Sequence, residues 1–196
     1  MTTFPTLLLA STSPYRKALL SRLGLPFACE APGVEEDERG GETPPERALR
    51  LARAKAEAVA GRHRGALVIG SDQVASHVAG GRQQVLHKPG DRENCLRQLQ
   101  LMSGQTARFD TALAILRDGR MIEHVDVTLV RFRLLDDAAI HSYVDREPAF
   151  DCAGGFKIEG LGVTLFESVE SRDPTALIGL PLIAVCAALR QLGVVV

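Results

Sequence analysis

The chain of 196 residues contains no tryptophan, few other aromatic residues (5% in all) and no long uninterrupted run of hydrophobic residues. A membrane-spanning helix needs about 20 consecutive apolar residues, so the sequence contains no candidate for one. It also has no basic stripe interleaved with aromatic residues, the pattern typical of nucleic-acid-binding modules. Membrane proteins and nucleic-acid-binding modules are therefore not expected.

Charge of either sign is also not in excess, because 23 Lys and Arg residues stand against 24 Asp and Glu residues. Non-specific binding to a nucleic acid polymer or to an anionic membrane requires a broad basic surface, so the balance argues against both partners. A pocket can still concentrate a few cations around a small polyanion. The composition therefore stays compatible with a small anionic ligand.

Cysteine is scarce and scattered, with four residues, no C-x-x-C pair and no Cys/His spacing of a metal site. Cys152 and Cys186 lie in apolar surroundings, which predicts that they are core residues. Reduced thiols are expected in the cytoplasm, where we place the protein. The first ten residues lack the basic region of a signal peptide and are predicted to lead into a first strand.

Helical and strand patterns alternate along the whole chain. Single strands are predicted at residues 7–10, 27–31, 66–69 and 163–169, and hairpins at residues 74–86 and 107–134. Helices are predicted to begin at residues 14, 44, 91, 136 and 181, the first after Ser13 with Pro14 and the second at the capping box of residues 43–46. The interleaving predicts an α/β fold, and the hairpins predict a mixed sheet. Without a linker, residues 1–196 are expected to form one domain.

The segment ASTSPYRK at residues 10–17 is the first candidate for a functional site. Ser13 is the predicted N-cap of a helix that has Pro14 at its first position. Free backbone N–H groups, the helix dipole and the cations Arg16 and Lys17 would together bind phosphate. A capped helix with two exposed basic residues explains the pattern equally well, because no Gly-rich P-loop is present.

Acidic residues supply two more candidates. Asp72 follows the apolar residues 66–69, and open α/β sheets bind ligands at the carboxyl ends of their strands. An Asp that forms a turn is the commoner explanation. Residues 35–38 are four consecutive acids in a predicted loop, and one of them would share a divalent cation with Asp72 unless the loop is simply solvated. Lys55 and Lys88 are single cations that surface positions would also explain.

Eight segments together resemble the Maf family of nucleoside triphosphate pyrophosphatases. They keep the order of the family over almost the whole chain: LLASTSPYRK (8–17), VEE (34–36), AKA (54–56), IGSDQV (69–74), KP (88–89), SGQT (103–106), AGGF (153–156) and GLPL (179–182). The resemblance implies a two-lobed α/β fold, similar to inosine triphosphatases, with an elongated mixed sheet flanked by helices and a central cleft. It also implies a hydrolase that releases pyrophosphate from a nucleoside triphosphate, and it allows a homodimer.

The resemblance further assigns the catalytic and metal-binding residues. Asp72 matches the proton acceptor that activates the attacking water, and Asp72 and Glu36 are expected to bind a divalent cation, Mg²⁺ or Mn²⁺. Aspartate is a weak base at neutral pH, so a metal that acidifies the water would assist it.

The phosphate chain is expected to contact four residues by the same resemblance: Ser11, Arg16, Lys55 and Lys88. The three cations among them would neutralise the charge that develops on the pyrophosphate leaving group. One position departs from the family, which often has Gly where this chain has His87.

Tyr15, Gln73 and Glu159 distinguish the branches of the family. The branch that hydrolyses dTTP and UTP has Arg, Thr and Gln there, so this chain is more similar to the branch associated with 7-methyl-GTP. That branch often has Trp in place of Tyr15. N7-methylation makes guanine cationic, which favours an aromatic face such as Tyr15. The two N–H donors of the guanine edge suit a carboxylate such as Glu159.

The expected function is the hydrolysis of 7-methyl-GTP to 7-methyl-GMP and pyrophosphate. Two alternatives stay open at this point. One is a pyrophosphatase of the same family that prefers dTTP, UTP or ordinary GTP. The other is a nucleotide-binding regulator of cell division without significant turnover.

Overall fold

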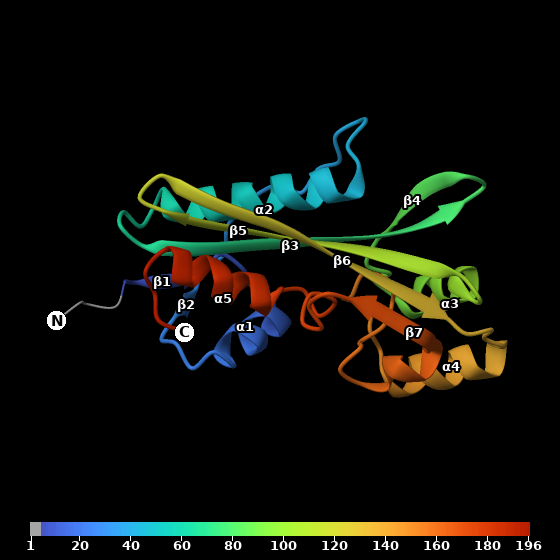
Figure 1. Cartoon of the computed structure of the whole chain (residues 1–196). Coiled ribbons are helices and arrows are strands. Elements are labelled where there is room, and N and C mark those ends of the chain that lie inside the picture. The colour runs from blue at the N-terminus through green and yellow to red at the C-terminus, as the bar shows by residue number, and fades with distance from the viewer. Residues whose placement is uncertain (1–4) are drawn as a thin grey trace. The chain divides into compact units, whose positions relative to one another are not determined.

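The computed structural model describes residues 5–196, and Figure 1 shows its helices and strands. Residues 1–4, where the segment leading into the first strand begins, lie outside the described residues, as does the side chain of Arg82. Alternating helices and strands confirm the predicted α/β class. In chain order the elements are β1 (Leu7–Leu9), α1 (Pro14–Ser21), β2 (Ala28–Cys29), α2 (Pro44–Ala60), β3 (Leu67–Ala79), β4 (Arg82–Leu86), α3 (Arg92–Met102), β5 (Thr106–Arg117), β6 (Arg120–Phe132), α4 (Asp137–Arg146), the 3₁₀ helix η1 (Leu161–Leu165), β7 (Phe166–Ser171) and α5 (Leu182–Gln191).

The strands form a mixed sheet, as predicted. Their order is β2-β1-β3-β5-β6-β7, and β4 pairs with β3 outside this path. β1 is parallel to both β2 and β3, whereas β4 is antiparallel to β3 and β7 is antiparallel to β6. None of the helices in residues 5–196 has the length and apolar composition that a membrane span requires.

Capping residues mark the starts of α1, α2, α3 and α4, whereas α5 has no side-chain cap. Ser13, Asp91 and Asp136 are the N-caps of α1, α3 and α4, and each side chain accepts a hydrogen bond from the N–H three residues later. At α2, the backbone N–H of Thr43 donates to the carboxylate of Glu46 at 2.9 Å. Such bonds satisfy polar groups that the first turn and its flanking residue would otherwise leave unpaired.

The chain divides into two compact units, of which unit 1 comprises the described residues up to Gln73, Thr111–Asp126 and Asp173–Val196. Helix α2 lies on one face of its strands, and α1 and α5 lie on the other (Figure 1). Large aliphatic side chains fill its core: Leu7, Leu9, Leu19, Leu20, Leu67, Ile69, Leu113 and Ile115. This core fixes β1, β3 and α1, which carry or adjoin most of the predicted site residues.

Unit 2 comprises Val74–Asp110 and Val127–Arg172. Helices α3 and α4 pack together in it. Four phenylalanine rings make edge-to-face contacts with centroids 4.7–5.7 Å apart: Phe109, Phe132, Phe156 and Phe166. One domain with two lobes around a cleft stays a prediction.

The strand predicted at residues 66–69 is longer than expected. β3 continues to Ala79, so Asp72 lies within the strand, and the prediction that it follows the strand end is wrong. Gly-Ser-Asp is a sequence typical of turns, which explains the error. Gly70 instead permits close packing: a Cβ there would lie 2.2 Å from the carbonyl oxygen of Ala52 on α2. The extended backbone therefore places a carboxylate on a buried strand.

Other predictions need smaller corrections. The strand predicted at residues 27–31 is only Ala28–Cys29. The strand predicted at residues 163–169 begins only at Phe166, because residues 163–165 belong to η1. The prediction that Cys152 and Cys186 are core residues is wrong, because both are half-buried and Cys95 is the fully buried cysteine. Apolar neighbours in sequence do not determine burial when the segment lies at the surface.

Candidate active site

The turn between β1 and α1 brings two serine hydroxyls to the start of the helix. The N–H of Ser13 donates to Oγ of Ser11 at 3.1 Å, and Oγ of Ser13 accepts from the N–H of Arg16 at 3.4 Å. Ser11 is buried, with 5% of its surface exposed. Hydroxyl groups and the N-terminal end of α1 thus lie together, as the sequence predicts.

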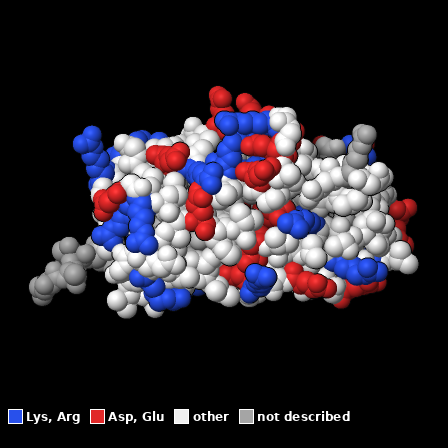
Figure 2. Space-filling view, turned by 45° about the horizontal axis from the view of Figure 1, so that its top comes forward, with Lys and Arg blue, Asp and Glu red and all other residues white. Residues whose placement is uncertain are grey.

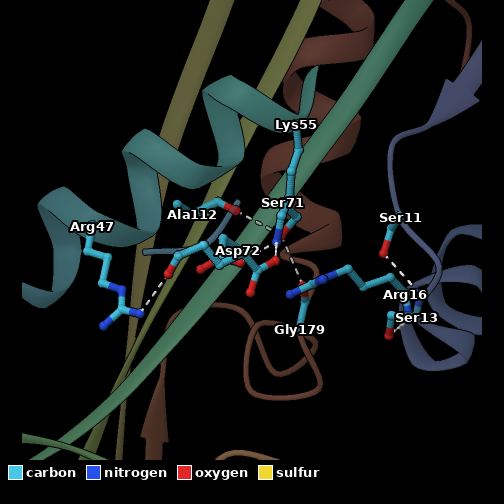
Figure 3. Close-up of polar contacts among 10 residues, drawn as sticks. Ser11, Ser13, Arg16, Arg47, Lys55, Ser71, Asp72, Ala112 and Gly179 are labelled. Atoms are coloured by element: carbon cyan, nitrogen blue, oxygen red, sulfur yellow. Dashed lines mark hydrogen bonds and ion pairs between the residues drawn. The ribbon is translucent and has the colours of Figure 1, made fainter. Parts of the chain in front are cut away.

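Arg16 extends from α1 toward the part of β3 that carries Asp72 (Figure 3). Its Nε donates to the carbonyl oxygen of Gly179 at 2.9 Å. Loss of water around the guanidinium lowers the pKa of Arg16, and the negative charges of Asp72 and Glu36 partly oppose that shift. Arg16 therefore belongs electrostatically to the same group as the two acids.

Lys55 joins the two acidic candidates. Its Nζ lies 2.6 Å from Oδ1 of Asp72 and 2.5 Å from Oε1 of Glu36. Lys55 and Asp72 are 5% and 6% exposed, whereas the side chain of Glu36 is 55% exposed. A buried ammonium needs such partners, so the alternative that Lys55 is a solvated surface residue is wrong.

Two arginines of α2 hold the acidic loop. Nη2 of Arg47 donates to the carbonyl oxygen of Glu36 at 3.1 Å, and Nη2 of Arg50 donates to that of Asp37 at 3.0 Å. Figure 3 shows Arg47 making this contact beside the Lys55–Asp72 pair. Arg47 also pairs with the side chain of Glu38. The loop is therefore anchored and not merely solvated. Arg47 and Arg50, one helical turn apart on the helix that follows the acidic run, are the sequence signal for this anchoring.

The segment before α5 is attached to β3 and β5. Oγ of Ser71 donates to the carbonyl oxygens of Ala112 (2.8 Å) and Gly179 (3.0 Å). Nε2 of Gln73 donates to Oγ1 of Thr111 at 2.9 Å and to two carbonyl oxygens of residues 176 and 177. Sequence patterns did not indicate Thr111 or Gly179 as site residues, because these contacts join positions more than 35 residues apart.

Three other predicted residues are half-buried or exposed. Tyr15 lies on α1 and is half-buried. Lys88 and Glu159 both belong to unit 2 and are exposed. Lys88 lines a surface hollow of about 440 Å³ together with Asn94, Arg97 and other residues. Five predicted residues are thus gathered in unit 1 near α1, α2 and β3: Ser11, Arg16, Glu36, Lys55 and Asp72.

The surface seen in Figure 2 carries basic and acidic side chains interspersed with each other. That face has no broad area of one sign, which agrees with the near-zero net charge of −1. The group around Lys55 is balanced as well, with the cations Arg16 and Lys55 beside the acids Glu36 and Asp72.

Residues 5–196 contain no cluster of three or more His, Cys, Asp or Glu side chains with metal-site geometry. Glu36 and Asp72 nevertheless converge on one cation, the ammonium of Lys55. Mg²⁺ is commonly bound by one or two carboxylates, with substrate phosphates and water completing its shell. The pair fits a divalent cation that binds together with a phosphorylated substrate.

This chain is similar to proteins of one known family. Residues 6–192 match the family model described as Maf-like protein. Proteins named 7-methyl-GTP pyrophosphatase are similar over nearly their full length. The one from Xanthomonas oryzae pv. oryzae is 52% identical over 96% of this chain and 97% of its own, and the one from Ralstonia nicotianae is 53% identical over 95% of each. The solved structure of the Staphylococcus aureus Ham1 protein has a TM-score of 0.46 and 15% identity, covering 65% of this chain and 71% of that chain.

Proposed function

The chain belongs to the Maf family, and we propose that it is a single-domain enzyme that hydrolyses 7-methyl-GTP to 7-methyl-GMP and pyrophosphate. Relatives 52–53% identical over nearly full length carry the name 7-methyl-GTP pyrophosphatase. The family match runs from residue 6 to residue 192, which supports one domain. The observation that carries the proposal is the buried Lys55–Asp72 pair with Glu36 and Arg16 beside it, since such a charged group suits an anionic substrate and its attacking water.

We propose that the phosphate chain binds at the start of α1. The hydroxyl of Ser11, at the positive end of the α1 dipole, would donate to a phosphate oxygen, and Arg16 and Lys55 would supply positive charge. Lys88 of unit 2 is proposed as a further phosphate contact. Removal of water from the guanidinium of Arg16 strengthens its attraction for an anion, because the local dielectric constant is low.

A divalent cation, Mg²⁺ or Mn²⁺, would be held by Glu36 and Asp72 and would lower the pKa of water bound to it. Asp72 is held at Oδ1 by Lys55, so the carboxylate keeps one orientation while it accepts the proton of the attacking water. The P–O bond to water forms as the bond between the α- and β-phosphates breaks. Arg16 and Lys55 then neutralise the charge on the pyrophosphate that leaves.

We propose that Tyr15 and Glu159 contact the methylated base. The ring of Tyr15 would lie against the cationic guanine, a contact typically worth 0.5 to about 2 kcal/mol. The carboxylate of Glu159 would accept from the two N–H donors of the guanine edge. Gln73, the third position that distinguishes this branch, bonds the segment before α5 and is not proposed as a base contact. A cytoplasmic location and a homodimer stay predictions of the sequence.

Product analysis with a panel of nucleotides tests the function. With Mg²⁺, 7-methyl-GTP should yield equal amounts of 7-methyl-GMP and pyrophosphate, with a higher kcat/KM than GTP, dTTP or UTP. Equal kcat/KM values for GTP and 7-methyl-GTP would contradict the base preference. Binding of every nucleotide without release of pyrophosphate would instead favour the regulator.

A further inference from the structure

The segment of residues 173–181, which leads into α5, is fixed at both ends by side-chain hydrogen bonds. At its start, Oδ1 of Asp173 accepts from the N–H and the hydroxyl of Thr175. At its end, Oγ1 of Thr175 accepts from the N–H of Leu182 at 2.8 Å. The middle of the segment is held separately, by residues of β3 and β5. Each bond in this middle part joins atoms within unit 1.

Gln73 supplies the main attachment of that middle part. Its Nε2 donates to Oγ1 of Thr111 (2.9 Å) and to the carbonyl oxygens of Ala176 (3.0 Å) and Leu177 (3.1 Å). Oγ1 of Thr111 also donates to the Ala176 carbonyl oxygen at 3.0 Å. An amide NH₂ group has two hydrogens, so these three acceptors use its whole donor capacity inside the protein.

The Ala176 carbonyl connects this attachment to Arg16. It also accepts from the backbone N–H of Gly179 at 2.9 Å. The carbonyl oxygen of Gly179 in turn accepts from Nε of Arg16 at 2.9 Å and from Oγ of Ser71 at 3.0 Å (Figure 3). Gly179 has φ +124°, a backbone conformation that L side chains rarely adopt. The carbonyl that fixes Arg16 therefore depends on an unusual backbone geometry, which its neighbours must maintain.

We propose that Gln73 is a positioning residue for the phosphate end of the substrate. Through Ala176 and Gly179 it keeps the guanidinium of Arg16 aimed at the phosphate chain. This inference rests on the proposed function, because it needs Arg16 to bind phosphate. It differs from a role of Gln73 in donating to the base, because both amide hydrogens are used inside the protein.

Inorganic tripolyphosphate, which has no base, separates the two roles. Its inhibition constant with Mg²⁺ should be measured for the full chain with 7-methyl-GTP as substrate. Gln73→Met keeps the length of the side chain and removes its hydrogen bonds, and Thr111→Val removes the hydroxyl that bonds both Gln73 and Ala176. Each should weaken inhibition about tenfold, the loss expected from one or two misplaced hydrogen bonds. The ratio of kcat/KM for 7-methyl-GTP over GTP should stay unchanged.

Three further variants make the test specific. Thr111→Ser keeps the hydroxyl, so tripolyphosphate should inhibit this variant as strongly as it inhibits the wild type. A general loss of packing would weaken the inhibition instead. Glu159→Gln should show the opposite pattern to Gln73→Met. It should change the ratio of kcat/KM for 7-methyl-GTP over GTP and leave the inhibition by tripolyphosphate unaltered. Combining Gln73→Met with Arg16→Lys should weaken inhibition by less than the product of the two single effects, because both act through one contact.

Each outcome decides between the two proposals. If Gln73→Met and Thr111→Val change the base ratio and leave tripolyphosphate inhibition intact, the positioning role is wrong and the proposed function stands. If Arg16→Lys also leaves inhibition intact, or tripolyphosphate does not inhibit the wild type, the phosphate site is wrong and the positioning role falls with it. Should Gln73→Met not fold, comparing Thr111→Val with Thr111→Ser gives the same decision.

Discussion

Nζ of Lys55 lies 2.6 Å from Oδ1 of Asp72, and less than a tenth of either side chain is exposed. Lys55 comes from α2 and Asp72 from the middle of β3, so the packing of that helix on the sheet brings the pair together. Burying two charges is unfavourable unless they are paired, and removing one partner leaves the other uncompensated. The pair thus holds the Asp72 carboxylate in one orientation where water is largely excluded.

Replacing Asp72 by Asn should abolish hydrolysis and preserve nucleotide binding. The amide is nearly isosteric but is a much poorer proton acceptor, so turnover of 7-methyl-GTP should fall by about 10³-fold, within the range of general-base effects. Pyrophosphate release measures turnover, and isothermal titration calorimetry measures the dissociation constant. Asp37→Asn, a change in the exposed acidic loop, is the matched control and should retain turnover. A loss of less than tenfold in Asp72→Asn would exclude Asp72 as the proton acceptor.

Replacing Lys55 by Met should tighten binding of Mn²⁺ in the absence of nucleotide. The ammonium lies between the two carboxylates proposed to hold the metal, so it competes with a cation for them. Electron paramagnetic resonance of Mn²⁺ should show a severalfold lower dissociation constant for Lys55→Met and a higher one for Glu36→Gln. Turnover of Lys55→Met should still fall, because a phosphate contact is lost. Weaker Mn²⁺ binding in Lys55→Met would contradict the competition.

Replacing Glu159 by Gln should reduce the preference for the methylated base. A charge-assisted pair of hydrogen bonds becomes neutral, so the ratio of kcat/KM for 7-methyl-GTP over GTP should fall about tenfold. Glu167→Gln, which alters an exposed acid that pairs with Arg131 on β6, is the control and should leave the ratio unchanged. An unchanged ratio in Glu159→Gln would assign base recognition to other residues.

Replacing Gly70 by Ala should destabilise the fold. A Cβ at this position would lie 2.2 Å from the carbonyl oxygen of Ala52 and 2.8 Å from the backbone nitrogen of Ala56, so α2 must move. Overpacking of this kind costs about 1–3 kcal/mol, measured as the free energy of unfolding in urea. Gly40→Ala is the matched control, since nothing lies within 4 Å of its Cβ and its φ is not positive. Equal stability of both variants would show that α2 adapts freely.

The same glycine shows where sequence patterns predict this protein and where they do not. Helix starts at Ser13, Asp91 and Asp136 were predicted correctly, because capping depends on residues three positions apart. The continuation of β3 through Gly70 is not predicted, because it depends on close packing against α2, a helix that precedes β3 in the chain. Local turn propensity points the other way, and tertiary packing outweighs it.

The residues of the site likewise fall into those that local motifs predict and those that only tertiary contacts reveal. The types of residue that bind phosphate and accept a proton follow from motifs, so Arg16 and Asp72 were candidates from sequence. That Lys55 is buried follows only from its partners, 17 residues ahead and 19 residues behind. The Gln73 network could not be predicted, since backbone carbonyls of Ala176 and Leu177 accept its bonds and any residue type supplies a carbonyl.

Stability should decline in alkali partly because of Cys95. This thiol is fully buried on α3, and burial raises its pKa from 9.0 to about 11. The folded pKa exceeds the unfolded one, so the group stabilises the fold fully below pH 9 and loses that contribution as the pH rises through about 11. By about pH 10.5 the loss should be about 2 kcal/mol. Urea unfolding at about pH 8 and about pH 10.5 measures it, and Cys95→Ala should lose correspondingly less. Equal losses in both proteins would mean that other groups cause the alkaline decline.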